Sequence, residues 1–183
     1  MNRATSLSAV FVAVLSLAAA GCAVPLPRED TMEAKSQAKS APELLQRMLD
    51  VSNESLDLHG GQWTYLDEAR TPWDGTRTSG YMAENCPGVD GSYRFANTVF
   101  GPPVEDPEAA VDKYVSHFEQ QGFTEVNRFN GDVPPSGGEG YYITVSVKDD
   151  EGTKLIYQAG QHLSSLSVEG ACSDDPAMYE KTT

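Results

Sequence analysis

The sequence has few of the residues that usually carry chemistry: three cysteines, three histidines and two tryptophans in 183 residues. It contains no CxxC pair, no Gly-x-Ser-x-Gly turn and no glycine-rich loop followed by lysine. These absences remove the redox, hydrolase and phosphate-binding signatures that a sequence can show. No loop with calcium-binding spacing is present either. The sequence therefore predicts no catalytic residue, no metal ligand and no cofactor.

Basic residues are also scarce, because 13 Lys and Arg stand against 27 Asp and Glu, for a net charge of −14. A surface this acidic repels nucleic-acid phosphates and anionic lipid head groups. We therefore expect no nucleic-acid partner. The composition is typical of a soluble domain whose charges are solvated.

No apolar run is long enough to span a bilayer. The longest, Leu7 to Ala20, follows Asn2 and Arg3 and ends in small residues. A positive start, about fourteen apolar or small residues and a small-residue cleavage site are typical of a secretory signal. We predict that residues 1–21 are removed as a signal peptide.

The tetrad Ala19-Ala20-Gly21-Cys22 resembles the bacterial lipobox, departing from it at Ala19, where that motif prefers leucine. The resemblance implies that Cys22 receives a diacylglyceryl group and becomes the mature N-terminus. Acyl chains would then hold the protein on the extracytoplasmic face of the cell membrane. An ordinary secretory signal with an unmodified cysteine is the alternative. In a host with two membranes, the choice between inner and outer membrane stays open.

With Cys22 acylated, Cys86 and Cys172 are the remaining cysteines, in a compartment that permits disulfides. Both lie beside turn-forming residues, so we predict one disulfide that joins a loop to the C-terminal strand. A metal or redox site is the less favoured alternative, since neither cysteine has a histidine nearby.

The region after Cys22 predicts a tether and then an ordered domain. Residues 22–40 are small, charged or proline, which is typical of a flexible segment. Ser40 and Glu43 have the spacing of a helix capping box. Apolar residues at three- and four-residue steps then predict a helix to about Leu58: Leu45, Met48, Leu49 and Leu56. We place the domain at residues 41–183.

Asp106 and Pro107 predict the start of a second helix, and Gly122 its end. The stripe on its buried face is expected to be Val111, Tyr114, Val115 and Phe118. The other segments alternate with the two-residue period of strands. They are residues 63–65, 93–99, 124–129, 141–147, 155–159 and 166–172.

This order of elements predicts an α+β fold, in which an antiparallel sheet carries two helices packed on one face of a single domain. Whether the two halves are a duplication stays open.

Each histidine has a structural interpretation. His59 ends the first helix, where a cationic side chain suits the helix dipole. His117 is expected at the rim of the second helix's apolar face, and His162 on a strand near Ser164 and Ser165. Neighbours along a strand do not form a catalytic triad.

Aromatic residues gather in one segment, and Trp73, Trp63 and Tyr81 are candidate binding residues. If they form a recognition surface, Trp73 should be exposed. The interpretation we favour is that Trp63 packs in the core and that Trp73 pins its loop onto it.

Several short pieces of the sequence resemble small actinobacterial lipoproteins, including the LppA-like group: the lipobox, the helix Glu43–Leu58, the Gly61-Gln62-Trp63 segment and the helix start at Asp106. The resemblance implies anchoring and an α+β domain but no reaction. We hypothesise a non-catalytic binding or scaffolding domain of the cell envelope, with an envelope protein, a glycan or a small molecule as partner. A lipid-anchored hydrolase and a carrier of apolar ligands are the alternatives.

The lipobox yields a direct prediction. Replacing Cys22 with alanine should leave an unlipidated precursor that the lipoprotein signal peptidase does not cleave. Intact-mass analysis of the native protein checks this, because an unacylated N-terminus would contradict the anchor.

Overall fold

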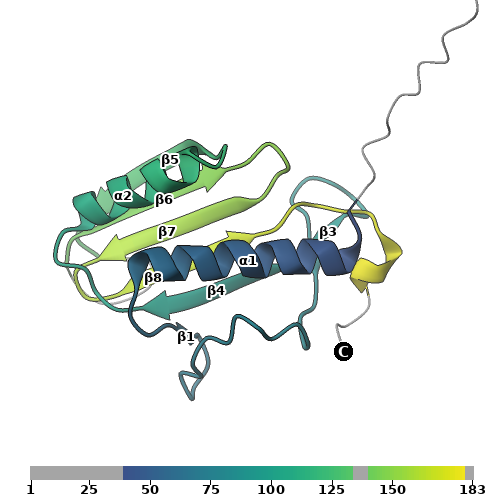
Figure 1. The fold of residues 1–183 in the computed structure, drawn as a ribbon, viewed down its shortest axis with the longest axis horizontal. Helices are drawn as coiled ribbons and strands as arrows, with labels where there is room; N and C mark the ends of the chain where they lie inside the picture. The colour runs from purple at the N-terminus through teal and green to yellow at the C-terminus, as the bar shows by residue number, and fades with distance from the viewer. Residues whose placement is uncertain (1–38, 134–139, 180–183) are drawn as a thin grey trace, which may run out of the picture. The chain divides into compact units, whose positions relative to one another are not determined.

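A computed structural model describes residues 39–133 and 140–179. The predicted signal peptide, Cys22 and residues 23–38 of the predicted tether lie outside the described residues. The elements are α1 (Ala41–His59), β1 (Thr64–Tyr65), β2 (Glu84–Asn85), β3 (Tyr93–Arg94), β4 (Ala96–Gly101), α2 (Pro107–Glu119), β5 (Thr124–Gly131), β6 (Tyr142–Lys148), β7 (Lys154–Gly160), β8 (Ser164–Glu169) and the 3₁₀ turn η1 (Pro176–Tyr179) (Figure 1).

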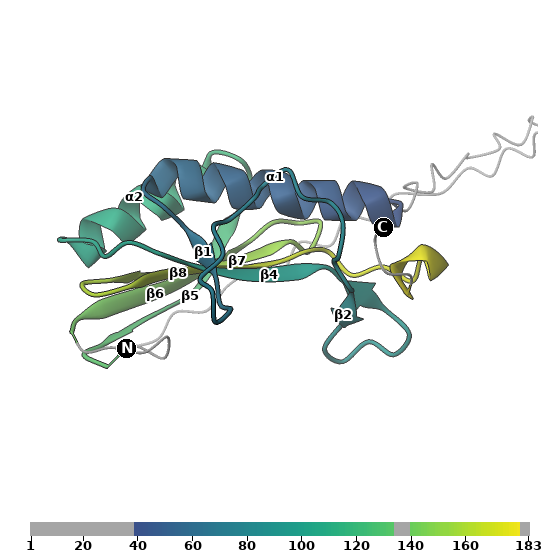
Figure 2. The ribbon, with the colours of Figure 1, turned by 90° about the horizontal axis from the view of Figure 1, so that it is seen from below.

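The strands form one six-stranded sheet in the order β1-β4-β8-β7-β6-β5, and β2 and β3 form a separate two-stranded sheet. Every pairing is antiparallel. Both helices lie against the same face of the large sheet (Figure 2). The predicted α+β class, the antiparallel sheet and the placement of both helices on one face are confirmed.

The first helix begins where the capping residues predicted. The backbone N–H of Ser40 donates to Glu43 Oε2 at 2.8 Å, which satisfies a donor that the helix itself leaves free. The N–H of Ala41 donates to Asp175 Oδ2 at 2.9 Å, so the C-terminal segment also holds this helix end. The predicted apolar stripe, including Met48 and Leu49, is buried.

The second helix also begins at its predicted capping residue and buries its predicted face. The Asp106 side chain accepts from Ala109 N–H at 3.0 Å, and the predicted stripe is buried. Gly122 has φ +89°, a left-handed conformation that glycine adopts without strain. This turn lets the N–H of Phe123 donate to Phe118 O at 3.1 Å and places the Phe123 ring in the core.

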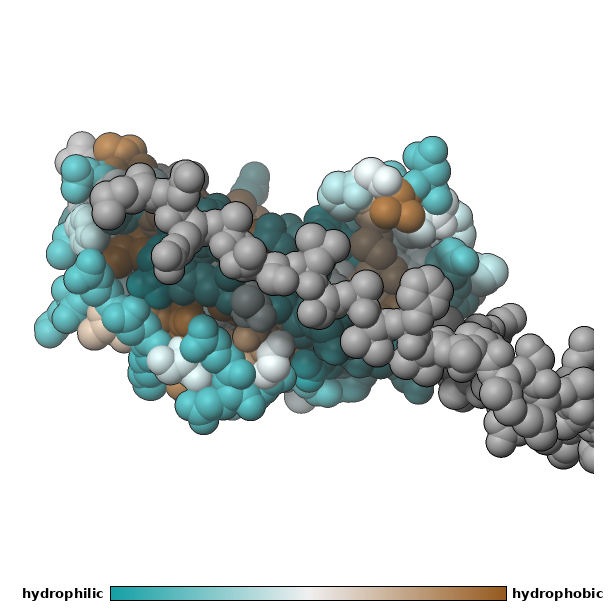
Figure 3. Space-filling view, turned by 90° about the horizontal axis from the view of Figure 1, so that it is seen from above, coloured by the Kyte–Doolittle hydropathy of each residue, from teal (hydrophilic) through white to brown (hydrophobic). Residues whose placement is uncertain are grey.

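The core lies between the helices and the inner face of the sheet. Tyr114 of α2 stacks on Tyr157 of β7 with ring centroids 4.6 Å apart, and Phe118 lies 4.8 Å from Tyr114. Leu155, Leu166 and other apolar side chains of β6–β8 complete it. On the side shown in Figure 3, the visible described residues are mostly hydrophilic and the apolar ones lie in separate patches.

Two strand boundaries differ from the sequence-based expectation. The predicted strand 93–99 is divided at Phe95, because Tyr93 and Arg94 pair with β2 whereas Ala96–Gly101 pairs with β8. The last strand ends at Glu169, before Cys172. The chain then turns toward β3, where Ser173 forms a bridge with Tyr93.

This turn brings Cys172 to Cys86. The two cysteines have the geometry of a disulfide, with Cα atoms 6.1 Å apart, within the range that a disulfide requires. Nearby, the ring centroids of Tyr179 and Tyr93 lie 4.2 Å apart, and Met178 is buried. The C-terminal segment is thus joined to the small sheet and to the start of α1.

Neither helix of the described part of the chain is both long enough and apolar enough to cross a membrane.

The disulfide is expected to contribute strongly to stability, because it closes a loop with a sequence separation of 86 residues. Replacing both Cys86 and Cys172 with serine should lower the free energy of unfolding by about 4–5 kcal/mol, chiefly through the greater freedom of the unfolded chain. Denaturant unfolding of both proteins measures this difference. Two free thiols in oxidised, denatured wild-type protein would contradict the bond.

Candidate functional site

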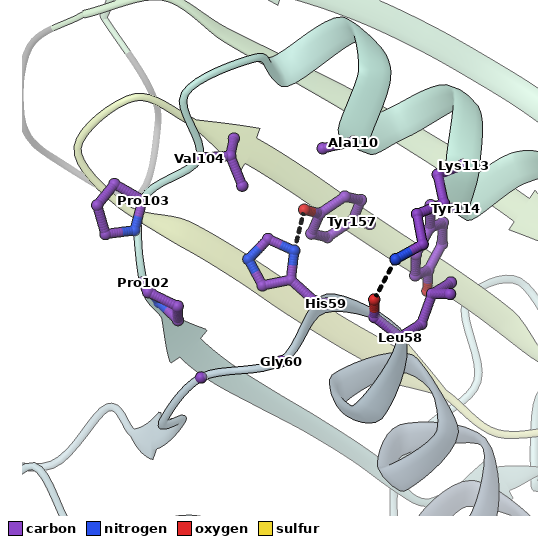
Figure 4. A pocket seen from close by; sticks show the side chains of 11 residues that line it. Leu58, His59, Gly60, Pro102, Pro103, Val104, Ala110, Lys113, Tyr114 and Tyr157 are labelled. Atoms are coloured by element: carbon purple, nitrogen blue, oxygen red, sulfur yellow. Dashed lines mark hydrogen bonds between the residues drawn. The ribbon is translucent and has the colours of Figure 1, made fainter.

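The described residues form a pocket of about 260 Å³ where the end of α1, the β4–α2 connection and the first turns of α2 meet above β7 (Figure 4). Its lining residues are Leu58, His59, Gly60, Gly61, Pro102, Pro103, Val104, Ala110, Lys113, Tyr114 and Tyr157. They come from segments that are far apart in the sequence.

Local backbone rules shape the mouth of this pocket. Gly60 and Gly61 have φ of +78° and +79°, so the chain leaves α1 through a turn that other residues rarely adopt. A Cβ atom on Gly61 would lie 2.6 Å from Pro102 Cγ, closer than two carbons can approach. The two glycines therefore allow the rigid Pro102-Pro103 segment to lie against the helix end.

A polar pair, in which Tyr157 is buried and His59 is half-buried, lies at the base of the pocket. The Tyr157 hydroxyl lies 2.7 Å from His59 Nδ1, and the two rings meet edge to face at 5.5 Å. Tyr157 is only 2% exposed, and the neighbouring Ser164 is fully buried. The second ring nitrogen of His59 points away from Tyr157, toward Pro102 and Pro103 (Figure 4).

The surroundings keep this pair uncharged. Burial lowers the pKa of His59, the Pro102 carbonyl acts in the opposite direction, and the positive charge of Lys113 lowers the pKa further. Burial raises the pKa of Tyr157, against an opposing effect of the Ser164 hydroxyl. The Pro102 carbonyl, on the side of the second ring nitrogen, favours the tautomer with the hydrogen on Nε2, so that Nδ1 accepts from the Tyr157 hydroxyl. The Nε2–H group is thus directed toward Pro102.

Lys113 is the only lining residue with a full charge. Its Nζ donates to Leu58 O at 2.9 Å, at the negative end of the α1 dipole (Figure 4). Among the described residues, no carboxylate lies within salt-bridge distance of this ammonium group, whereas Arg47, Arg94 and Arg128 each have an acidic partner.

This arrangement offers hydrogen-bond donors to a ligand but no nucleophile. No Ser, Thr, Cys, Asp or Glu side chain lines the pocket, and the Tyr157 hydroxyl is already bonded to His59. Within residues 39–133 and 140–179 no group of three or more His, Cys, Asp or Glu side chains is placed to hold a metal ion. The acidic turn after β6 is ordered internally, since Asp149 Oδ1 accepts from Thr153 N–H at 2.7 Å.

The structure corrects one interpretation of the histidines. His59 lies at the end of α1 as expected, but its lowered pKa makes it a neutral pocket residue and not a cation that faces the helix dipole. His117 lies at the rim of α2, where Nε2 lies 2.8 Å from Glu54 Oε1 and links the two helices. His162 is exposed.

The aromatic candidates do not form one exposed surface. Trp63 is buried, its Nε1 donates to Gly60 O at 3.0 Å, and its ring lies 5.2 Å from His59. Trp73 is half-buried and donates from Nε1 to Asn53 Oδ1 at 2.8 Å. Tyr81 is also half-buried and lines a smaller hollow of about 160 Å³. The packing interpretation therefore describes Trp63 and Trp73, and the Trp63 ring packs edge to face against His59.

Sequence patterns did not identify the pocket. His59, Lys113 and Tyr157 come from three elements, and none of them belongs to a motif. The available signal was that Gly60-Gly61 and Pro102-Pro103 each mark a turn at the end of a helix or strand. This signal does not reveal that the two turns lie against each other.

Comparisons with known proteins add little to this geometry. No protein-family model matches the sequence, and no curated protein matches it. Among solved structures, the chain is similar to the crystal structure of a DUF4853 family protein from Actinomyces odontolyticus, with a TM-score of 0.47 and 14% identity over 76% of this chain and 73% of that one. We take no functional argument from a likeness at this level.

The lowered pKa of His59 predicts a pH dependence of stability. The unfolded chain takes up a proton on His59 near pH 6.5, whereas the folded chain does so only at lower pH. The stabilisation that depends on neutral His59 is therefore complete above about pH 6.5 and decreases as the pH falls through the folded pKa.

Melting temperatures between pH 8 and pH 4 check this. The wild type should lose more stability on acidification than His59→Gln does. His162→Gln, the same change at an exposed position, should follow the wild type. Parallel curves for all three proteins would contradict the assignment.

Trp73 predicts a packing effect. Replacing Trp73 with alanine should lower the free energy of unfolding by about 3 kcal/mol, the lower end of the range for buried aromatic truncation, because the side chain is only partly buried. Trp73→Phe keeps most of the packing and loses the bond to Asn53, at a cost of about 1 kcal/mol. An unchanged melting temperature for Trp73→Ala would restore the recognition hypothesis.

Proposed function

We propose that this protein is a lipid-anchored, extracytoplasmic binding protein of the cell envelope, whose α+β domain holds a small ligand in the pocket between α1, α2 and β7. The observation that carries the proposal is the uncharged Tyr157–His59 pair at the base of the pocket, with the unneutralised Lys113 at its edge.

Binding without catalysis accounts best for the chemistry of the lining. The bond to His59 satisfies the buried Tyr157 hydroxyl, and Lys113 keeps N–H donors at the edge of the pocket. The apolar walls of Pro102, Pro103 and Val104 supply contact area. A concave site with apolar walls and a few directed polar groups is typical of a small-molecule site, and its 260 Å³ suits a compact ligand.

Anchoring at Cys22 is supported by the sequence alone, since residues 1–38 are outside the described part. The signal-like run and the lipobox-like tetrad support it, and the disulfide geometry of Cys86 and Cys172 agrees with an oxidising compartment. We place residues 22–40 as the tether and residues 41–183 as the domain that stands off the membrane.

The two alternatives have weaker support in the described residues. A hydrolase would need a histidine beside a serine or aspartate, but His59 faces Tyr157, and His117 faces Glu54 between the helices. A carrier of large apolar ligands would need an extended dry cavity, whereas this pocket is small and polar at its base.

The binding proposal is tested by filling the pocket. Trp63 lies against His59 and reports on the site, and Trp73→Phe removes the other tryptophan. In that background, a set of small carboxylates, amides, amines, alcohols and sugars is screened for a change in Trp63 fluorescence. We expect at least one class to produce a saturable change.

Ala110→Phe should abolish this response, because Ala110 lines the pocket. Ala109→Phe is the matched control, since Ala109 is exposed on the same helix turn and does not line the pocket. If no compound produces a response, or if both variants respond equally, the pocket is not a binding site.

A further inference from the structure

Resting on the proposed function, we propose that the ligand is a small carboxylate with a compact apolar body, and that Lys113 holds its charged group while the prolines and Val104 enclose the rest. The proposal concerns the ligand's chemical class, which the pocket geometry alone leaves undefined.

The first support is the charge at the pocket. Acidic residues outnumber basic ones two to one in this chain, yet the single charged lining residue is a lysine. Of the described arginines, Arg47, Arg94 and Arg128 have acidic partners; for example, Arg94 Nη1 lies 2.6 Å from Glu169 Oε2. Among the described residues, Lys113 has the Leu58 carbonyl as its hydrogen-bond partner and no acidic one. An ammonium group without a counter-charge attracts anions and repels cationic ligands at close range.

The second support is the inventory of donors and acceptors. An ammonium group has three N–H donors, and the Leu58 carbonyl uses one of those on Lys113. His59 Nε2 faces Pro102, whose carbonyl already interacts with the imidazole, so the remaining N–H groups of Lys113 are the side-chain donors left for a ligand. No lining side chain offers a free carboxylate or amide oxygen. A head group rich in acceptors complements this set, and a carboxylate has two oxygens that accept hydrogen bonds in its plane.

The third support is the shape and polarity of the walls. Pro102, Pro103, Val104 and Ala110 are apolar, so a fully hydrated inorganic anion would leave them in contact with water. The volume of 260 Å³ is that of about eight or nine water molecules in the liquid. A branched or ring-bearing short acid fits these limits, whereas a long fatty acid does not.

The test compares three molecules with the same branched body and different head groups: isovalerate, isovaleramide and isopentylamine. The full chain is used in its lipid-anchored form in nanodiscs, labelled with ¹³C at alanine methyl groups. Shifts of the Ala110 methyl signal report binding inside the pocket. We expect isovalerate to bind at least tenfold more tightly than isovaleramide, and isopentylamine to bind most weakly. Inorganic phosphate is included and should not shift the signal.

Variants of Lys113 test its role directly. Lys113 is exposed, so its replacement is tolerated by the fold. Lys113→Gln should weaken isovalerate binding on the order of tenfold or more, because a hydrogen bond to a charged group is lost, while leaving isovaleramide almost unchanged. Lys113→Arg should restore most of the affinity. Lys148→Gln makes the same change in net charge on an exposed residue outside the pocket and should bind isovalerate as the wild type does.

The outcomes separate this inference from the proposed function. If isovaleramide or isopentylamine shifts the Ala110 signal as tightly as isovalerate does, or if Lys113→Gln binds normally, the carboxylate assignment is wrong while the pocket remains a binding site. If phosphate binds more tightly than isovalerate, the site is one for inorganic anions and the assignment is again wrong. If neither these molecules nor the compounds of the fluorescence screen bind, both proposals fail.

Discussion

The contacts of Tyr157 hold together the three parts of the molecule that form the pocket. Its ring stacks on Tyr114 of α2 at 4.6 Å, its backbone belongs to a central strand of the sheet, and its hydroxyl bonds to His59 at the end of α1. A buried hydroxyl must have a partner, and His59 supplies it. The position of the helix end, and with it the Gly60-Gly61 turn, therefore depends on one side chain of the sheet.

The same contact determines the electrostatics of the site. Because Tyr157 donates to Nδ1, the imidazole hydrogen lies on Nε2, which faces Pro102. Lys113 adds a positive charge beside it and thereby favours the neutral imidazole, since two nearby cations repel. The result is one positive charge with free N–H donors at the pocket of a strongly acidic protein. A ligand that supplies acceptors replaces the water there without requiring any residue of the pocket to change its charge.

The opposite end of the domain is held by different means. There the cysteine pair, the Tyr93–Ser173 bridge and the bond from Ala41 N–H to Asp175 join the C-terminal segment to the start of α1 and to the small sheet. The first helix is thus fixed at both ends, by the C-terminal segment and by Tyr157. A helix held in this way keeps His59 in a defined position, which is what a binding site with few polar groups needs.

Periodicity and capping determined the secondary structure and the fold class. The stripes of α1 and α2, the caps at Ser40 and Asp106 and the alternation of β6 and β7 are local patterns, and a sheet with one covered face follows from them. Tertiary structure alone decided the division of residues 93–99 at Phe95, because strand partners are set by the order of strands in the sheet. It also decided the pocket: His59, Lys113 and Tyr157 follow one another at intervals of 54 and 44 residues, and no local rule relates them. His59 shows what the sequence leaves undetermined. A histidine at a helix C-terminus is expected to be cationic from its local position, but burial between the sheet and the helices lowers its pKa and keeps it neutral.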